Sequence, residues 1–526
     1  MSCLPPTKAK ILSTFQPSHY QQAIFDFVRS GTGDGVVRAT AGAGKTTTLV
    51  EIAKQLPSDL DAVFLAFNTH TANELRARLP RHVRACTVHS LGRRSLLDRF
   101  SQLGKRDPDT RKSRLLIKES IDRLKLEFAV PSEQWLQAEK YLQELLRFSV
   151  ANLTDTKVEE RVAQLAVEYN LTAPADQGLE VQCHREVRQL LRRRLDVFQE
   201  HGLYDYEDML YLPIVLKLDI PKYDFVFVDE AQDLSAVQLE LVLKAVREGG
   251  RRLFVGDERQ AIYGFTGADA DSLARIVERT GATVLPLSVT YRCPRSHVAL
   301  AQQLAPEIEA APGAPEGKIH VIKEAWLPRW VRRGDLVICR YTAPLVSNCL
   351  ALLQQQIPAV VRGMDIGRDL LEMATQLFAG GLNGWEEQLG AYRIAEEARI
   401  RRRAANEIDA ERQIAVRSDL LDSLEVLTAE VVRQGHHRLA NLTEYIADFF
   451  SDKGGAPVVF STIHRAKGKE ADRVFILYPD NMPAVYARTA AAARGEACVQ
   501  FVALTRAKKD LIFVEQQRSE MAVVQP

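Results

Sequence analysis

The sequence predicts an α/β fold in which buried parallel strands alternate with covering helices. The apolar pair at 36–37 leads through a glycine loop at 39–46 into an amphipathic run at 47–56, which is the pattern of strand, loop and helix. An apolar stretch at 62–67 is a second predicted strand, and the continuous apolar run at 225–228 is typical of a strand buried on both faces. Such alternation predicts a parallel sheet with helices on both of its faces.

The composition is ordinary for a globular protein and argues against several classes. Of the 526 residues, 46% are hydrophobic and 26% charged, with 69 Lys and Arg against 68 Asp and Glu. The net charge of +1 neither supports nor excludes a nucleic-acid partner, because a neutral protein can carry a basic groove. The seven cysteines form no Cys-x-x-Cys pair, which argues against a zinc site or a disulfide framework. With no signal peptide and no apolar run of membrane-spanning length, the sequence predicts a cytoplasmic protein without a membrane partner.

The segment at 39–46 predicts a phosphate-binding loop. Gly42 and Gly44 allow backbone N–H groups to turn toward a phosphate, and the following helix points its positive end there. Lys45 supplies a mobile positive charge, and the Thr46 hydroxyl can ligate Mg²⁺. Ala39 stands where such loops usually have their first glycine, so the alternative is a glycine turn before a helix.

A helix is predicted at 18–28, after the start signal Pro17-Ser18. Gln21 lies on this helix, upstream of the phosphate loop. A glutamine amide can recognise adenine through its paired donor and acceptor. The alternative is that Gln21 is a solvated residue on the helix surface.

Between residues 92 and 202 the alternation stops and the sequence is almost entirely helical, which predicts an inserted helical domain. The basic cluster at 185–194 could contact phosphates, but a solvated helix face explains it more simply.

Two carboxylates follow the buried run at 225–228. Asp229 and Glu230 stand at the carboxyl end of a parallel strand, where α/β sheets bind ligands. Asp229 is expected to hold Mg²⁺ through water, and Glu230 to orient and deprotonate the water that attacks a γ-phosphate. The alternative is an acidic turn between a strand and a helix.

A third strand is predicted at 252–255 and leads to Gln260, which is placed to sense the γ-phosphate. Tyr263 and Phe265 follow, two residues apart. They offer either a base-stacking surface or ordinary core packing.

Together these motifs resemble those of the UvrD/Rep-type superfamily 1 helicases. The matching segments, in the family's order, are 39–46, 67–75, 87–90, 229–233, 256–268, 287–292, 461–474 and 501–508. The resemblance implies an α/β protein with two RecA-like parallel-sheet lobes, helical insertions, and ATP bound between the lobes. The charged helical stretch at 385–432 is shorter than the second insertion common in the family, which is similar to compact F-box-helicase-like and phage-type members.

The resemblance also implies roles for individual residues. The expected catalytic residues are Glu230, Gln260, Arg292 and Arg506. The expected ATP-binding residues are Gln21, Ala41, Gly42, Ala43, Gly44, Lys45, Thr46, Thr47, Tyr291 and Glu470. Thr46 and Asp229 are expected to hold Mg²⁺, and Phe67, His89, Tyr263 and Phe265 to bind DNA. The expected cofactors are therefore ATP and Mg²⁺.

The expected domain boundaries follow the same resemblance. The first lobe comprises residues 1–91 and 203–285, with a helical insertion at 92–202. The second lobe comprises residues 286–370 and 445–526, with a short helical insertion at 371–444.

The resemblance implies an ATP-dependent single-stranded DNA translocase and 3′-to-5′ DNA helicase acting in repair, recombination or defence. The expected partners are single-stranded DNA and junctions between single- and double-stranded DNA. No nuclease constellation follows residue 508, so any nuclease acting with this chain is expected to be a separate polypeptide, as is a repair or defence partner. Two alternatives remain: a protein-stripping translocase or motor subunit that unwinds little alone, and a nucleotide-controlled nucleic-acid-binding scaffold.

Overall fold

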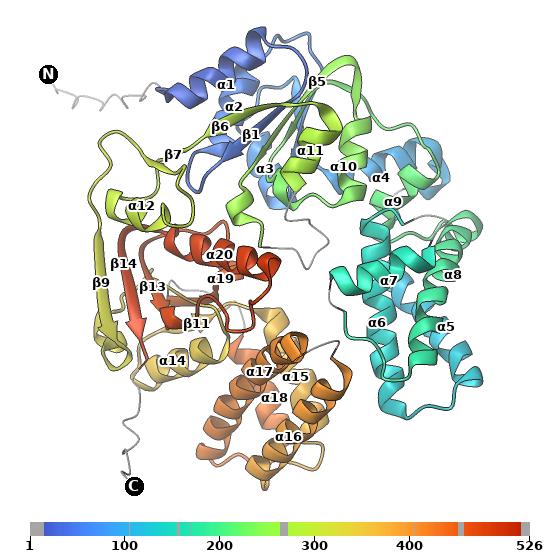
Figure 1. The fold of residues 1–526 in the computed structure, drawn as a ribbon, viewed down its shortest axis with the longest axis vertical. Helices are drawn as coiled ribbons and strands as arrows, with labels where there is room; N and C mark the ends of the chain where they lie inside the picture. The colour runs from blue at the N-terminus through green and yellow to red at the C-terminus, as the bar shows by residue number, and fades with distance from the viewer. Residues whose placement is uncertain are drawn as a thin grey trace, which may run out of the picture.

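The structure is a computed structural model that describes residues 15–104, 106–154, 158–169, 171–262, 272–404, 407–450 and 457–516. Two parallel sheets lie in adjacent parts of the molecule, and each is accompanied by a group of helices that extends away from it (Figure 1). The α/β fold class predicted from the sequence is confirmed, including the parallel direction of the strands. Within the described residues, no helix combines the length and the apolar character that crossing a membrane requires.

The first sheet has six parallel strands in the order β3-β2-β4-β5-β1-β6. They are β1 (Gly35–Ala39), β2 (Ala62–Ala66), β3 (Val83–Thr87), β4 (Tyr223–Val228), β5 (Val246–Gly256) and β6 (Thr283–Leu287). We call this sheet, with the helices that cover it, the first lobe. Strand β1 lies between β5 and β6, so that Val36 pairs with Phe254 on one side and Val284 on the other.

Helices cover both faces of the first sheet. On one face lie α1 (His19–Ser30), α2 (Lys45–Gln55) and α3 (Thr69–Arg76). On the other lie α4 (Val88–Arg99), α10 (Ala236–Lys244) and α11 (Ser272–Thr280). The neighbours Val37 and Val36 belong to these two different cores, because side chains alternate between the faces of a strand.

The inserted helical domain is formed by α5 (Lys112–Glu127), α6 (Ser132–Ala151), α7 (Val158–Glu168) and α8 (Gln177–His201), which pack with α4 and α9 (Asp208–Val215). Its base contains a buried ionic cluster. The Arg194 Nε atom lies 2.7 Å from Asp208 Oδ1, and the Lys112 Nζ atom lies 2.7 Å from Asp208 Oδ2. Arg194 also pairs with Asp205.

The basic cluster on α8 is therefore divided between two environments. Arg185, Arg188, Arg192 and Arg193 are exposed, as expected for a solvated helix face. Arg194 is fully buried, so the expectation of a solvated face is wrong for this residue. Its position on α8 turns it toward the acidic residues at the start of α9, where it closes the base of the helical domain.

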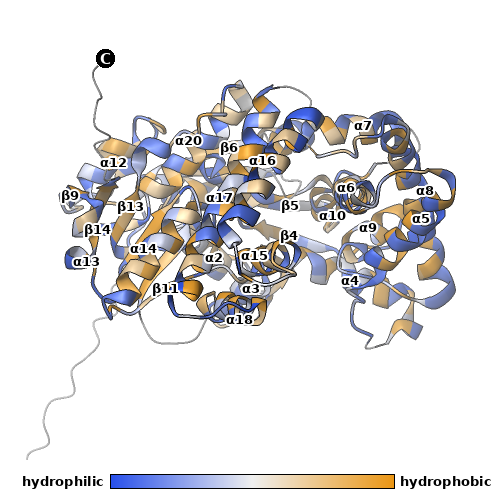
Figure 2. Ribbon diagram, turned by 90° about the horizontal axis from the view of Figure 1, so that it is seen from below, coloured by the Kyte–Doolittle hydropathy of each residue, from blue (hydrophilic) through white to orange (hydrophobic). Residues whose placement is uncertain are grey.

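The second sheet also has six parallel strands, in the order β11-β12-β10-β13-β14-β9. They are β9 (Lys318–Lys323), β10 (Leu336–Cys339), β11 (Ala359–Val361), β12 (Val458–Thr462), β13 (Ala471–Leu477) and β14 (Ala507–Glu515). We call this sheet, with its covering helices, the second lobe. On one face α19 (Ile463–Ala466) and α20 (Ala490–Leu504) pack against the strands, and α14 (Ala343–Gln354) covers the other. Figure 2 shows hydrophobic residues concentrated on these strands and on α14.

The second group of helices is continuous with the core of the second lobe. It comprises α15 (Met364–Leu377), α16 (Trp385–Arg403), α17 (Glu407–Arg433) and α18 (Leu439–Phe449). Leu424 and Leu427 of α17 share one apolar core with Val337 of β10. The Asp419 carboxylate of α17 accepts backbone N–H groups from Thr342 and Ala343 at the start of α14, all at 2.8–2.9 Å. These helices therefore share the apolar core of the sheet.

Candidate active site

The glycine loop lies between β1 and α2. Gly42 and Gly44 have φ values of 72° and 76°, a left-handed conformation that costs glycine little and other residues more. Gly42 also needs to be small, because a Cβ atom there would lie 2.6 Å from Cβ of Arg292. Ala41 and Ala43 are buried, which leaves the backbone of the loop to meet a ligand. The loop thus has the conformation expected of a phosphate cradle, at the N-terminus of α2.

The two carboxylates that follow β4 face this loop. The Thr46 hydroxyl donates to Asp229 Oδ2 at 2.8 Å, and the Lys45 ammonium lies 2.8 Å from Glu230 Oε2. Glu230 adopts a left-handed backbone conformation with φ 52°, at the turn between the strand and the short helix η2 (Ala231–Asp233). The structure therefore brings together the loop and the acidic pair, which are separated by more than 180 residues.

The charges of these groups depend on one another. Burial and the neighbouring Glu230 carboxylate raise the pKa of Asp229. Burial opposes ionisation of Glu230 too, but the Lys45 and Lys467 ammonium groups outweigh it and lower the pKa of Glu230. Burial lowers the pKa of Lys45, whereas Glu230, Asp257 and Asp229 raise it by more. At neutral pH the site therefore holds an ionised Glu230 next to a protonated Lys45.

Thr46 and Asp229 fit a hard cation. Their oxygens are 2.8 Å apart, and hydroxyl and carboxylate oxygens are ligands that Mg²⁺ accepts. No group of three or more His, Cys, Asp or Glu side chains that could hold a metal occurs in the described part of the chain. A Mg²⁺ ion held by Thr46 and Asp229 would need further oxygen ligands, which water and a phosphate would supply.

Gln21 and Tyr291 lie on the other side of the loop. Gln21 is buried; its amide Nε2 donates to Thr48 Oγ1 at 2.9 Å, and its Oε1 accepts the backbone N–H of Ser18 at 2.9 Å. Gln21 is thus not the solvated residue of the alternative interpretation. The Tyr291 hydroxyl is 3.5 Å from Gln21 Oε1, and the backbone N–H of Tyr291 donates to the Gly42 carbonyl at 2.9 Å. Thr47 is half-buried in the first turn of α2.

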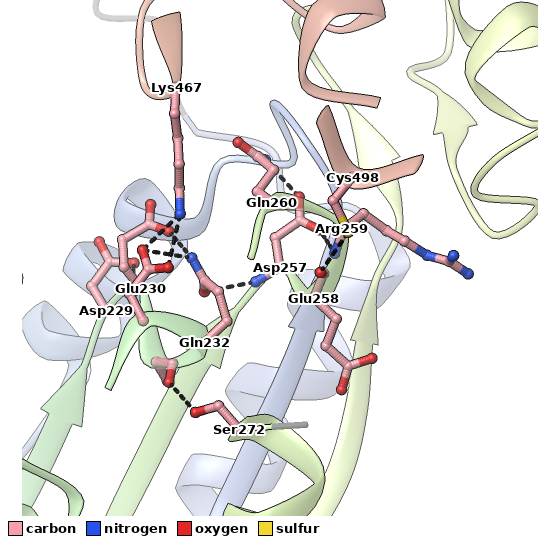
Figure 3. Close-up of polar contacts among 12 residues, drawn as sticks. Asp229, Glu230, Gln232, Asp257, Glu258, Arg259, Gln260, Ser272, Lys467 and Cys498 are labelled. Carbon is pink, nitrogen blue, oxygen red and sulfur yellow. Dashed lines mark hydrogen bonds and ion pairs between the residues drawn. The ribbon is translucent and has the colours of Figure 1, made fainter. Parts of the chain in front are cut away.

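Two arginines approach the site from the side of the second lobe. Arg292 Nε lies 2.6 Å from Glu470 Oε2, so the structure brings together two of the site residues predicted from the sequence. Arg506 is fully buried, and its Nη2 atom donates to Gln260 Oε1 at 3.2 Å. Gln260 Nε2 in turn donates to Asp257 Oδ2 at 2.6 Å (Figure 3).

The residues predicted to bind DNA are only partly described. Phe67 follows β2 and has 49% of its surface exposed. His89, in the first turn of α4, lines a small pocket together with Phe67 and Asp229, and burial lowers the pKa of His89. Tyr263 and Phe265 lie outside the described residues.

Four residues at the centre of the site were given no role from the sequence. They are Gln232, Asp233, Asp257 and Lys467, which form hydrogen bonds or ion pairs with one another or with Glu230. All four lie within the matching segments; Asp257 directly follows β5, and Gln232 and Asp233 lie in η2, shortly after β4. The sequence could have pointed to these residues as polar groups close to the ends of buried strands. It does not show which partner each of them has.

Two family models match the chain. The UvrD/REP helicase N-terminal domain matches residues 21–280, and the UvrD-like helicase C-terminal domain matches residues 387–518.

The chain is also similar to several named proteins. It is 25% identical to F-box DNA helicase protein 1 of Schizosaccharomyces pombe over 513 residues, which are 90% of this chain and 55% of that protein. It is 26% identical to F-box DNA helicase 1 of Gallus gallus over 267 residues, 49% of this chain and 25% of that protein. It is 24% identical to the ATP-dependent DNA helicase srs2 of Schizosaccharomyces pombe over 369 residues, 65% of this chain and 41% of that protein. The matches thus span about half or less of the length of each relative.

Proposed function

The chain belongs to the UvrD/Rep helicase family, and we propose that it hydrolyses ATP to move along single-stranded DNA and to unwind duplex DNA. Two observations carry this proposal: Lys45 and Thr46 of the glycine loop pair with Glu230 and Asp229 in the first lobe, and Arg506, which directly precedes β14, donates a hydrogen bond to Gln260 of the first lobe. Phosphoryl transfer depends on positioned charge around the γ-phosphate, and this arrangement provides it.

Each side chain has a distinct part in the proposed reaction. The loop backbone and Lys45 bind the phosphates, and Gln21 and Tyr291 bind the adenine. The Glu230 carboxylate, released from Lys45 when a phosphate takes that ammonium, orients the attacking water and accepts its proton. Arg292 and Arg506 stabilise the charge that develops on the transferred phosphoryl group. Mg²⁺, when held by Thr46 and Asp229, neutralises charge on the phosphate oxygens.

Movement would come from the interface between the lobes. The first lobe, proposed as residues 1–91 and 203–285, supplies the phosphate loop, and the second, proposed as 286–370 and 445–526, supplies the arginines. Binding of ATP draws the lobes together and hydrolysis releases them. The proposed 3′-to-5′ direction rests on the family resemblance alone.

Single-stranded DNA is the proposed track. The half-exposed ring of Phe67, beside His89, supports stacking of a base next to the nucleotide site. We further propose that junctions between single- and double-stranded DNA are substrates. The proposed partner is a separate nuclease or a repair or defence protein.

The test is steady-state ATP hydrolysis by the purified chain without nucleic acid, with single-stranded DNA, with duplex DNA and with RNA, at two salt concentrations. We expect strong stimulation by single-stranded DNA that weakens at the higher salt concentration, because phosphate contacts release counterions. A Lys45→Ala variant is the control for contaminating hydrolases. Absence of hydrolysis with every polymer would contradict the proposal and favour the nucleotide-controlled scaffold.

Unwinding needs a separate assay with duplexes that carry a 3′ or a 5′ single-stranded tail. We expect strand separation from the 3′ tail. Stimulated hydrolysis without strand separation would instead support a protein-stripping translocase or the motor subunit of a larger complex.

A further inference from the structure

Gln232 lies in η2, two residues after Glu230, and is almost completely buried. Its Oε1 atom accepts the backbone N–H of Asp257 at 2.9 Å (Figure 3). Its Nε2 atom donates to Glu230 Oε2 at 2.6 Å and to Asp233 Oδ2 at 3.3 Å. The backbone donor and the two carboxylates allow only one orientation of this amide, because Nε2 cannot accept and Oε1 cannot donate.

The space around Gln232 is closely fitted. A Cβ atom on Gly256, the last residue of β5, would lie 2.7 Å from Gln232 Oε1 and 3.0 Å from its backbone nitrogen. Only glycine at this position leaves room for the amide. Gln232 is thus held between the ends of β4 and β5.

The same cluster contacts the second lobe. Lys467, which follows α19, has its Nζ atom 2.7 Å from Asp233 Oδ2 and 2.9 Å from Asp233 Oδ1. Both side chains are buried, with exposed fractions of 8% and 2%. Figure 3 shows Lys467 pointing from the second lobe toward Glu230 and Gln232. Asp233 Oδ2 therefore receives both the ammonium of Lys467 and the amide of Gln232.

Two carboxylates compete for the Gln232 amide. With Lys467 in place, the charge of Asp233 is balanced and Glu230 holds the shorter hydrogen bond. If the lobes separated and Lys467 withdrew, Asp233 would lose its cation. A carboxylate that loses its cation binds more strongly to its remaining donors, and one of these is Gln232 Nε2, at 3.3 Å.

We propose that Gln232 is a positioning residue that couples contact between the two lobes, through Lys467 and Asp233, to the orientation of Glu230. This inference rests on the proposed ATP hydrolysis. In the closed arrangement Gln232 holds Glu230 toward the attacking water. In the open arrangement Gln232 turns to Asp233, and Glu230 loses the orientation needed for hydrolysis.

The first test replaces the donor and keeps the shape. Gln232→Glu retains an acceptor for the N–H of Asp257 but places a carboxylate against Glu230, and Gln232→Met removes both bonds without adding charge. We expect kcat of both variants to fall about 100-fold, as for a misplaced catalytic group. The KM for ATP and the affinity for a fluorescent ATP analogue should change less than about threefold, because Gln232 has no part in the proposed nucleotide contacts. Gln303→Glu, an exposed glutamine outside the site, controls for the added charge.

The second test is a double-mutant cycle on kcat with Lys467→Met and Gln232→Met. If Lys467 acts through Gln232, the double variant should be no slower than the Gln232→Met variant, since the shared step is already lost. Multiplied effects would overturn the coupling, and an unchanged kcat in Gln232→Met would overturn the positioning role. If Lys467→Met does not fold, Gly256→Ala takes its place, because the added methyl group displaces Gln232 from the side of β5. Gly256→Ala must then lower kcat and leave the KM for ATP unchanged. Any other result overturns the proposal.

Hydrolysis by the unaltered chain and by Glu230→Gln tests the proposed function separately from the coupling through Gln232. If the unaltered chain hydrolyses ATP and Glu230→Gln abolishes hydrolysis, the proposed function stands. The Gln232 results then bear on the coupling alone.

Discussion

Arg506 of the second lobe donates a hydrogen bond to Oε1 of Gln260 in the first lobe at 3.2 Å, although the guanidinium is fully buried. Its other acceptors are neutral: the carbonyls of Val502 and Lys469 and the hydroxyl of Thr505. Burial and the neighbouring Arg292 lower the pKa of Arg506 to about 9, below the 12.5 of a free side chain. The fold therefore buries a guanidinium whose hydrogen-bond acceptors are all neutral, which is unfavourable for a cation. Such a group is suited to receive the negative charge of a γ-phosphate.

The first prediction concerns this unfavourable charge. In Arg506→Met we expect hydrolysis to fall about 10³-fold, the lower end of the range for arginine fingers. The melting temperature without nucleotide should stay the same or rise, because a poorly compensated buried charge is removed. Hydrolysis assays and thermal unfolding measure the two effects, and Arg506→Lys controls for loss of the planar group alone. A large fall in melting temperature would show that Arg506 serves the packing of the second lobe instead.

The second prediction concerns Glu230. Glu230→Gln keeps the shape of the side chain but removes the base, so hydrolysis should fall about 10²- to 10⁴-fold. Nucleotide affinity should be retained or increase, because Lys45 no longer pairs with a carboxylate. Turnover and equilibrium binding of a fluorescent ATP analogue are the measurements. Normal turnover would exclude Glu230 as the base.

The third prediction concerns the DNA track. Phe67→Ala should weaken binding of single-stranded DNA about 5- to 150-fold, which corresponds to loss of one stacked base at about 1–3 kcal/mol. Hydrolysis without DNA should be unchanged. Fluorescence anisotropy with a labelled oligonucleotide measures the affinity, with Trp326→Ala as an exposed aromatic control in the second lobe. Equal affinities of Phe67→Ala and the unaltered chain would remove Phe67 from the track.

The fourth prediction concerns the base of the inserted helical domain. Arg194→Leu leaves Asp205 and Asp208 buried with Lys112 as the remaining cation. We expect a loss of about 3–5 kcal/mol in the free energy of unfolding, as when one partner of a buried ion pair is removed. Urea denaturation measures this loss, and Arg193→Leu, its exposed neighbour, should change the free energy by less than about 0.5 kcal/mol. Similar values for the two variants would contradict the importance of the cluster.

The sequence by itself determined the features that lie within a few residues of one another. One such feature is the phosphate loop between β1 and α2, which depends on glycines that adopt a left-handed conformation. Another is the acidic pair after β4, which follows the continuous apolar run of a buried strand. The parallel first sheet followed in the same way from strands that alternate with helices, whereas the second sheet was implied by the resemblance to the helicase family. The resemblance to the helicase family added roles for distant residues such as Arg292 and Glu470, but not the ion pair that these two side chains form.

Only the tertiary structure decided which distant groups meet. Lys467 and Asp233 are 234 positions apart, and Arg506 and Gln260 are 246 apart, so their contact depends on how the lobes pack. The burial of Arg194 in a run of otherwise exposed arginines, and the joining of α17 to the core of the second sheet, were decided in the same way. The physical reason is that local pattern specifies which face of an element is apolar, whereas the partner of a buried polar group is chosen by the packing of whole elements.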